Sequence, residues 1–207
     1  MIEDIARIKK EQARLAGLVI IKDVFSKAEN IGGVDYTIIN DRVIAAVVTC
    51  NQEMNPIDKA DSIMDANNAN YAGYKEASCI MDAIKKLKDK PDILLIRGDG
   101  ITHMRLGLAS YIGIALDMPT IGVSKTAGNG RVIDGLIYVE SEIKGYELPT
   151  RVGSRPVYIS PGHKISITSC PEIVKKSFKW PHKMPEPLAL AHKMVNKLKQ
   201  TLDATVV

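Results

Sequence analysis

The chain has 207 residues, of which 45% are hydrophobic and 25% are charged, and its net charge at pH 7 is +4. This composition is that of an ordinary globular protein and excludes an intrinsically disordered chain. No apolar stretch approaches the roughly 20 residues needed to cross a bilayer, and the N-terminus lacks the apolar core of a signal peptide. We therefore expect a cytoplasmic protein with one domain, residues 1–207, and no membrane partner. The slight basic excess favours a polyanionic partner only weakly.

Three cysteines, Cys50, Cys79 and Cys170, lie far apart in the sequence and have no CxxC spacing. An odd number of widely spaced cysteines argues against a disulfide framework and against a structural zinc site. We expect all three to be reduced thiols in the core.

The first third of the chain predicts one helix and a β-hairpin. Apolar residues at near-helical spacing predict an amphipathic helix over 1–16. Two runs rich in β-branched residues, VDYTII and VIAAVV, predict antiparallel strands joined by a tight turn at Asn40-Asp41-Arg42. Residues 51–72 are rich in Asn, Asp and Ala without clean periodicity, and we expect a long, partly irregular connection there.

The rest of the chain predicts an α/β fold. An i, i+3, i+4, i+7 pattern predicts a helix from Glu76 to about Lys90, ended by Pro91. The apolar runs at 92–96 and 120–123, with the helical segment 106–116 between them, predict a βαβ unit. Further strands are expected near 131–140 and 155–169, with a turn at Pro161-Gly162, and a final helix over 187–198.

Two carboxylates are candidates for chemistry, although each has a structural explanation. Asp35 lies inside the apolar strand VDYTII, where a carboxylate must be hydrogen-bonded, paired or bound to a cation. The alternative is that Asp35 accepts hydrogen bonds from backbone amides. Glu76, at the start of its helix, is explained equally well as a favourable charge on the helix dipole.

Polar residues also follow two predicted buried strands, at the edge where open α/β sheets usually place their sites. The first group is Arg97-Gly98-Asp99-Gly100-Ile101-Thr102-His103. Its glycines allow close approach of a ligand, Asp99 is a candidate metal ligand, and His103 is a candidate base-reading group. The alternative is an ordinary polar βα turn. Lys125 follows the next strand, where it could hold a phosphate or be merely solvated.

The remaining histidines are more simply structural. His163 is expected in a turn and His182 in a loop rich in Pro and Lys. His192 falls beside an apolar stripe of the last helix, where a histidine is usually hydrogen-bonded and structural.

Several motifs in order resemble the endonuclease V family of nucleases, which recognise inosine, the product of adenine deamination. They are GGVDYT, YKEA, DGITH, LGLAS, PTIGVSKT, RPVYISPGHKIS and PEPLALAH, within roughly residues 10–200. The resemblance implies an RNase H-like α/β fold, a mixed sheet flanked by helices. It also implies DNA or RNA containing inosine as the partner, and we expect a monomer.

The resemblance implies a role for each matching residue. Asp35 and Glu76 would bind Mg²⁺, with Mn²⁺ as an alternative ion, and Lys125 and His192 would complete the catalytic group. His103, with Gly98 and Gly100, would lie beside the pocket for the extruded base. The resemblance therefore implies a metal-dependent endonuclease of nucleic-acid repair that hydrolyses the second phosphodiester bond 3′ to the lesion, and the alternative is a family member that binds without cutting.

Two departures from the family pattern put catalysis in question. Arg97 stands where the family has a third acidic ligand, and a cation cannot ligate Mg²⁺. The family's Tyr-x-Pro-Gly wedge should fall at 67–70, which reads Asn-Asn-Ala-Asn, although Tyr71 is adjacent. Three outcomes stay open: Asp99 replaces the lost ligand, Arg97 holds the scissile phosphate beside a weaker metal site, or catalysis is lost and the chain only binds nucleic acid.

Overall fold

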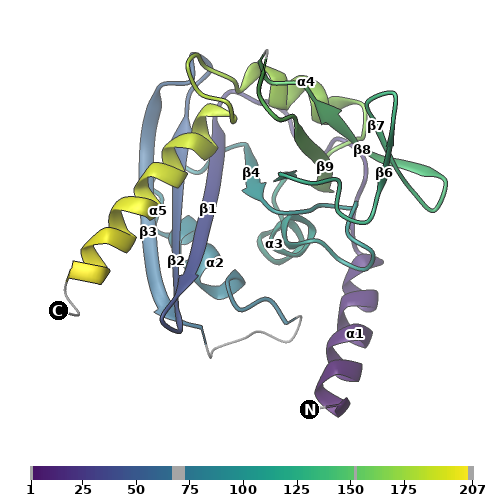
Figure 1. The fold of residues 1–207 in the computed structure, drawn as a ribbon, viewed down its shortest axis with the longest axis horizontal. Coiled ribbons are helices and arrows are strands. Elements are labelled where there is room, and N and C mark those ends of the chain that lie inside the picture. The colour runs from purple at the N-terminus through teal and green to yellow at the C-terminus, as the bar shows by residue number, and fades with distance from the viewer. Residues whose placement is uncertain (1, 67–72, 152, 205–207) are drawn as a thin grey trace.

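The computed structural model describes residues 2–66, 73–151 and 153–204. Its centre is one nine-stranded mixed sheet with helices on both faces (Figure 1). The strand order is β3-β2-β1-β4-β5-β9-β8-β7-β6. The α/β fold class expected from the sequence, a mixed sheet flanked by helices, is therefore confirmed.

The elements have the following bounds. The helices are α1 Ile2–Ala16, α2 Ala77–Lys85, α3 Leu108–Leu116, α4 Ser169–Lys176 and α5 Glu186–Ala204. The strands are β1 Ile31–Ile39, β2 Arg42–Cys50, β3 Pro56–Asp65, β4 Ile93–Arg97, β5 Thr120–Ser124, β6 Arg131–Ile133, β7 Leu136–Val139, β8 Glu142–Leu148 and β9 Val157–His163. No helix of the described residues is both long enough and apolar enough to cross a membrane.

The sheet is parallel only in its centre. β4 pairs in parallel with β1 on one side and with β5 on the other, while the remaining neighbours pair antiparallel. The carboxyl ends of β1, β4 and β5 therefore meet at one edge of the sheet. The residues that follow β4 and β5 are placed together for this reason.

Two apolar layers hold the helices against the sheet. On one face, residues of α2 and α3 such as Ile80 and Ile112 pack on Val34 and Leu94 of the central strands. On the other face, α4 and α5 pack on residues that include Ile93 and Leu95. Because β4 is buried between these layers, its sequence is a continuous apolar run, as expected for a central parallel strand.

Several sequence predictions are confirmed. The hairpin of β1 and β2 turns at Asn40 and Asp41, whose φ angles of 47° and 57° are those of a primed turn. The βαβ unit is β4-α3-β5. Cys50, Cys79 and Cys170 are buried and free, and burial raises the pKa of the Cys50 thiol to about 11.

The connection expected over 51–72 is wrong in part, because Pro56–Asp65 forms β3. This strand lies at the sheet edge and packs closely on one face only, so its sequence lacks an apolar run. The next helix also ends earlier than expected, at Lys85 instead of about Lys90. β8 and α4 were not predicted at all.

The turn expected at Pro161-Gly162 is wrong, because both residues lie inside β9. The register with β5 shifts between Thr120 and Ile121, and this irregularity accommodates a proline that has no N–H to donate. Gly162 is required by close packing, since a Cβ there would lie 2.3 Å from Oγ1 of Thr120. His163 is consequently a buried residue at the strand end and not a turn residue.

Candidate nucleic-acid site at the sheet edge

Asp35 is the centre of an ion cluster between β1, β4 and α5. Its residue is only 1% exposed. The parallel register pairs Val34 with Ile96, so the next residues, Asp35 and Arg97, lie side by side. Nη1 of Arg97 donates to Oδ1 at 2.8 Å and to Oδ2 at 3.0 Å. The charge of the buried carboxylate is thus balanced by a guanidinium from the neighbouring strand.

His192 approaches Asp35 from α5. Its Nδ1 lies 2.6 Å from Oδ2 of Asp35, and because an ionised carboxylate only accepts, Nδ1 is the protonated nitrogen. Nε2 lies 3.1 Å from Nδ2 of Asn196, which donates to it. The two bonds together orient the ring with Nδ1 toward Asp35 and Nε2 toward Asn196. Nη1 of Arg97 also lies 3.5 Å from Nδ1 of His192. Because both atoms are then donors, this contact is not a hydrogen bond.

The carboxylate of Asp35 has no acceptor capacity left. Oδ1 accepts from the backbone N–H of Tyr36 at 2.8 Å as well as from Arg97, and Oδ2 accepts from both Arg97 and His192. Two carboxylate oxygens offer about four lone-pair positions. All four are therefore taken by donors of the protein itself.

Glu76 lies close to this cluster but contacts a different residue. It directly precedes α2, is half-buried, and accepts a hydrogen bond from the Tyr36 hydroxyl. Burial, together with the negative charge of Glu76, raises the pKa of Tyr36 well above its usual value, so this phenol stays a donor. Glu76 is thus held by Tyr36, the residue that follows Asp35 in β1. The side chains of Tyr36 and Asp35 point to opposite faces of the sheet.

The loop after β4 packs closely against the backbone of neighbouring segments. Gly100 donates its N–H to Oγ of Ser160 at 2.9 Å, and a Cβ on Gly107 would lie 2.2 Å from the carbonyl oxygens of Asp99 and Gly100. Gly98 has a φ of 145°, which a side chain rarely allows. These glycines serve the close packing of the loop, as the sequence pattern indicated.

The carboxylate of Asp99 is directed at the segment after β5. Its Oδ2 would lie 3.2 Å from a Cβ on Gly128. No group of three or more Asp, Glu, His or Cys side chains suited to a metal ion occurs in the described part of the chain, so Asp99 does not complete a set with Asp35 and Glu76.

The residues present do not fit a divalent metal ion as they are arranged here. A metal would need a free oxygen of Asp35, and its place beside that carboxylate is taken by the Arg97 guanidinium. Arg97 therefore has to leave Asp35 before the expected Mg²⁺ or Mn²⁺ could bind. Two carboxylates with a cation beside them also carry too little net negative charge to favour Mg²⁺ binding.

His103 lies in the same loop, beside a hollow of about 300 Å³. Its Nδ1 accepts the backbone N–H of Arg105 at 3.2 Å, and burial lowers its pKa, so the ring is neutral at pH 7. Gly107 and Ser110 also line the hollow. The Oγ of Ser110 is buried and has no hydrogen-bond partner among the described residues.

Lys125 follows β5 directly and is exposed. Arg97 of β4 pairs with Val123 of β5 in the parallel register. Lys125 comes two residues after Val123 and therefore lies at the same end of the parallel strands. Asp35, inside β1, thus lies beside Arg97 at the end of β4, and Gly98, Gly100, His103 and Lys125 follow the ends of β4 and β5.

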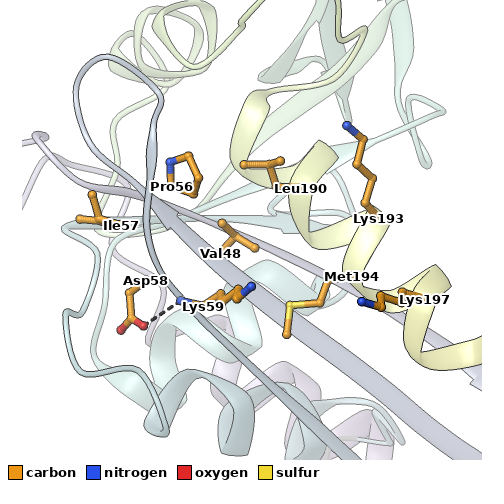
Figure 2. A pocket seen from close by; sticks show the side chains of 9 residues that line it. All are labelled: Val48, Pro56, Ile57, Asp58, Lys59, Leu190, Lys193, Met194 and Lys197. Carbon is orange, nitrogen blue, oxygen red and sulfur yellow. Dashed lines mark hydrogen bonds between the residues drawn. The ribbon is translucent and has the colours of Figure 1, made fainter. Parts of the chain in front are cut away.

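Other hollows lie away from these residues. A groove of about 640 Å³ runs between β3 and α5, with an apolar floor that includes Val48 and Met194 and with Lys59, Lys193 and Lys197 among its lining residues (Figure 2). None of the candidate site residues lines it. The carboxyl ends of β1, β4 and β5 form the candidate site, and this groove does not, because the residues capable of chemistry lie at those strand ends.

Tyr71 and the segment 67–70, where the family's wedge is expected, lie outside the described residues. Two contributors at the site were not predicted. Tyr36 holds Glu76, and Asn196 orients the ring of His192. A signal for Asn196 existed, since residues four apart on a helix are neighbours, and His192 and Asn196 have that spacing in the sequence.

The fold is that of solved endonuclease V structures. The catalytic domain of human endonuclease V superimposes with a TM-score of 0.86 at 21% identity, covering 97% of this chain and 98% of that one. Endonuclease V of Ciona intestinalis, solved in complex with a 24mer DNA containing an inosine followed by a ribo-adenosine, gives 0.82 at 22% identity, covering 98% and 100%. At these identities the structures establish the fold alone.

Sequence comparisons establish the family. The Endonuclease V family model matches residues 13–193. Endonuclease V of Dictyoglomus thermophilum is 33% identical over 205 residues, covering 92% of this chain and 87% of the relative. That of Archaeoglobus fulgidus is 32% identical over 216 residues, covering 99% and 96%. The chain belongs to the endonuclease V family, a family of nucleases.

Proposed function

We propose that this chain recognises inosine in DNA or RNA and binds the strand at the carboxyl edge of β1, β4 and β5, with little or no metal-dependent hydrolysis. The observation that carries the proposal is the contact of Arg97 Nη1 with both oxygens of Asp35, inside a site that keeps Asp35, Glu76, His103, Lys125 and His192. Binding survives this change because it depends on the neighbouring loops, whereas hydrolysis depends on a metal at Asp35.

Recognition is supported by family membership and by the hollow beside His103. To read one base, a protein of this kind has to turn it out of the stack into a pocket. The neutral His103 ring and the backbone at Gly107 are hydrogen-bonding groups suited to the edge of hypoxanthine. Lys125 is placed to neutralise a phosphate of the bound strand.

The test compares oligonucleotides that differ by a single inosine. Fluorescence anisotropy measures the affinity for labelled single and double strands with and without inosine, and a gel assay measures nicking of the same strands with Mg²⁺ or Mn²⁺. We expect a preference for inosine that His103→Ala reduces, and nicking close to background. Equal affinity for both strands would sink the proposal.

Metal-dependent nicking is the second candidate function. It is favoured by the retention of Asp35, Glu76, Lys125 and His192 around one sheet edge. In this case Asp35 and Glu76 would hold Mg²⁺ or Mn²⁺, which supplies activated water and stabilises the leaving oxygen. The expected product is a nick at the second phosphodiester bond 3′ to the lesion, abolished by Asp35→Ala. Robust nicking by the unmodified chain selects this candidate over the first.

A further inference from the structure

Arg97 uses only part of its hydrogen-bonding capacity on Asp35. Guanidinium has five N–H donors, and both contacts with Asp35 come from Nη1. No described residue accepts a hydrogen bond from Nε or Nη2. The side chain is 32% exposed, whereas that of Asp35 is 2% exposed. Three donors of a partly exposed cation are thus left without an acceptor among the described residues.

The guanidinium is also anchored at Nη1. Asp35 is fixed by the backbone N–H of Tyr36 and by His192, and it binds Nη1 through both of its oxygens. Nε–H and the adjacent Nη2–H together form the fork that matches two oxygens of a phosphate. Because Nη1 is anchored beforehand, less side-chain entropy is lost when an anion binds than for an unattached arginine.

We propose that Arg97 is a phosphate ligand that takes the place of a metal ion, so that this chain binds nucleic acid without a divalent cation. The proposal deepens the proposed function and rests on it for the identity of the strand. Lys125, on the neighbouring strand end, adds a second positive charge at the same edge. The negative charge of Asp35 is balanced by Arg97, so the ion pair as a whole does not repel the phosphate.

The experiment measures binding of a fluorescein-labelled single strand containing one inosine, in EDTA and in Mg²⁺, over a series of salt concentrations. We expect equal affinity of the unmodified chain in both buffers. Arg97→Gln removes the charge and the fork, and we expect about tenfold weaker binding, the loss typical of a charge-assisted contact. The slope of log K against log salt should fall by about 0.7, the value for one phosphate contact on a single strand.

Two further variants isolate the role of Arg97. Arg97→Lys keeps a cation beside Asp35, and therefore the fold, but lacks the fork, so we expect a loss of at least about threefold. Lys90→Gln removes the same charge at the exposed residue before Pro91, near the amino end of β4, and should bind as the unmodified chain does. Thermal unfolding of each variant verifies that the folded protein is compared, and Arg97→Lys decides if Arg97→Gln does not fold.

The outcomes separate this inference from the proposed function. Binding that EDTA weakens tenfold, or that neither Arg97 variant changes, overturns the role of Arg97 and leaves the inosine preference intact. The same titrations on a strand without inosine test recognition. Equal affinity for both strands, with the Arg97 dependence unchanged, removes the lesion specificity and keeps the phosphate site.

Discussion

Gly33 lies in backbone contact with Leu188: a Cβ on this glycine would be 2.3 Å from the amide nitrogen of Leu188 and 2.2 Å from the carbonyl carbon of Pro187. The start of α5 therefore crosses β1 at the closest distance that two backbones allow. His192 lies one turn further along α5, and Asp35 lies two residues after Gly33 on the same face of the strand. A glycine without chemistry of its own thus sets the distance between His192 and Asp35.

The first prediction concerns this crossing. Gly33→Ala forces α5 away from β1, and overpacking of this kind typically costs about 1–3 kcal/mol of unfolding free energy. Because His192 moves with the helix, its imidazole NMR shifts should also change. Urea unfolding measures the stability loss. Gly17→Ala is the matched control, since a Cβ there meets only ordinary contact at 3.4 Å. Equal stability of the two variants would contradict the close crossing.

The second prediction concerns the sign of a charge effect at Asp35. In a cluster of metal-binding carboxylates without metal, neutralising one carboxylate relieves repulsion and stabilises the protein. Here Asp35 is paired with Arg97, so Asp35→Asn should destabilise the chain by about 1–3 kcal/mol, because it removes the charge partner and one acceptor. Chemical unfolding in EDTA measures this.

Asp65→Asn is the control for that measurement, because Asp65 is an exposed carboxylate at the end of β3. Its neutralisation should change the stability by no more than about 0.5 kcal/mol. If Asp35→Asn instead stabilises the chain in EDTA, then Arg97 does not balance Asp35 in solution.

The central elements were predictable because their patterns are local. The apolar run at Ile93–Arg97 and the helical periodicity around Ile80 and Ile112 record burial directly in the sequence. β3 was not predicted because an edge strand has few buried positions. The turn predicted at Pro161 was wrong because a bulge in the pairing with β5 lets a proline lie inside a strand. Neither property is visible without knowing the neighbouring strand.

The site was predictable residue by residue but not as an arrangement. The motifs identified Asp35, Arg97 and His192, and the parallel register of β1 and β4 places the first two side by side. That Nη1 of Arg97 contacts both oxygens of Asp35, and that Asp99 lies against Gly128, depends on side-chain geometry. Sequence spacing alone left those outcomes open.

The third prediction concerns pH. Burial is the main cause that lowers the pKa of His163 and of His103 below the usual value of about 6.5. At about pH 7.5 and above, both rings are almost entirely neutral in the folded and the unfolded chain and contribute almost no pH dependence. As the pH falls below 6.5, the unfolded chain binds protons that the folded chain does not, so the stability decreases toward the lowered pKa values.

Urea unfolding between pH 7.5 and 5.5, above the range of most carboxyl groups, measures this loss. His163→Asn retains an acceptor for the backbone N–H of Ile20, which the ring receives at Nδ1, but it cannot titrate. The variant should lose less stability on acidification than the unmodified chain. An identical loss would show that His163 does not contribute.

The fourth prediction reverses the substitution that distinguishes this site. Arg97→Asp removes the guanidinium from Asp35, frees two of its four acceptor positions, and supplies a third carboxylate at the position where the family has one.

Without metal, this variant should be less stable than the unmodified chain, because like charges then lie close together. With Mn²⁺ or Mg²⁺ in large excess over its dissociation constant, metal binding to the folded state should raise its unfolding free energy by about 3 kcal/mol, whereas the unmodified chain should not respond. Thermal unfolding with and without the ion measures this independently of any reaction, and the nicking assay shows if hydrolysis returns with the metal. Arg97→Asn is the control, since it removes the cation without adding a ligand charge. A metal response in the unmodified chain equal to that of Arg97→Asp would mean that Arg97 yields its place to the ion, and that the guanidinium is not what keeps this site from binding metal.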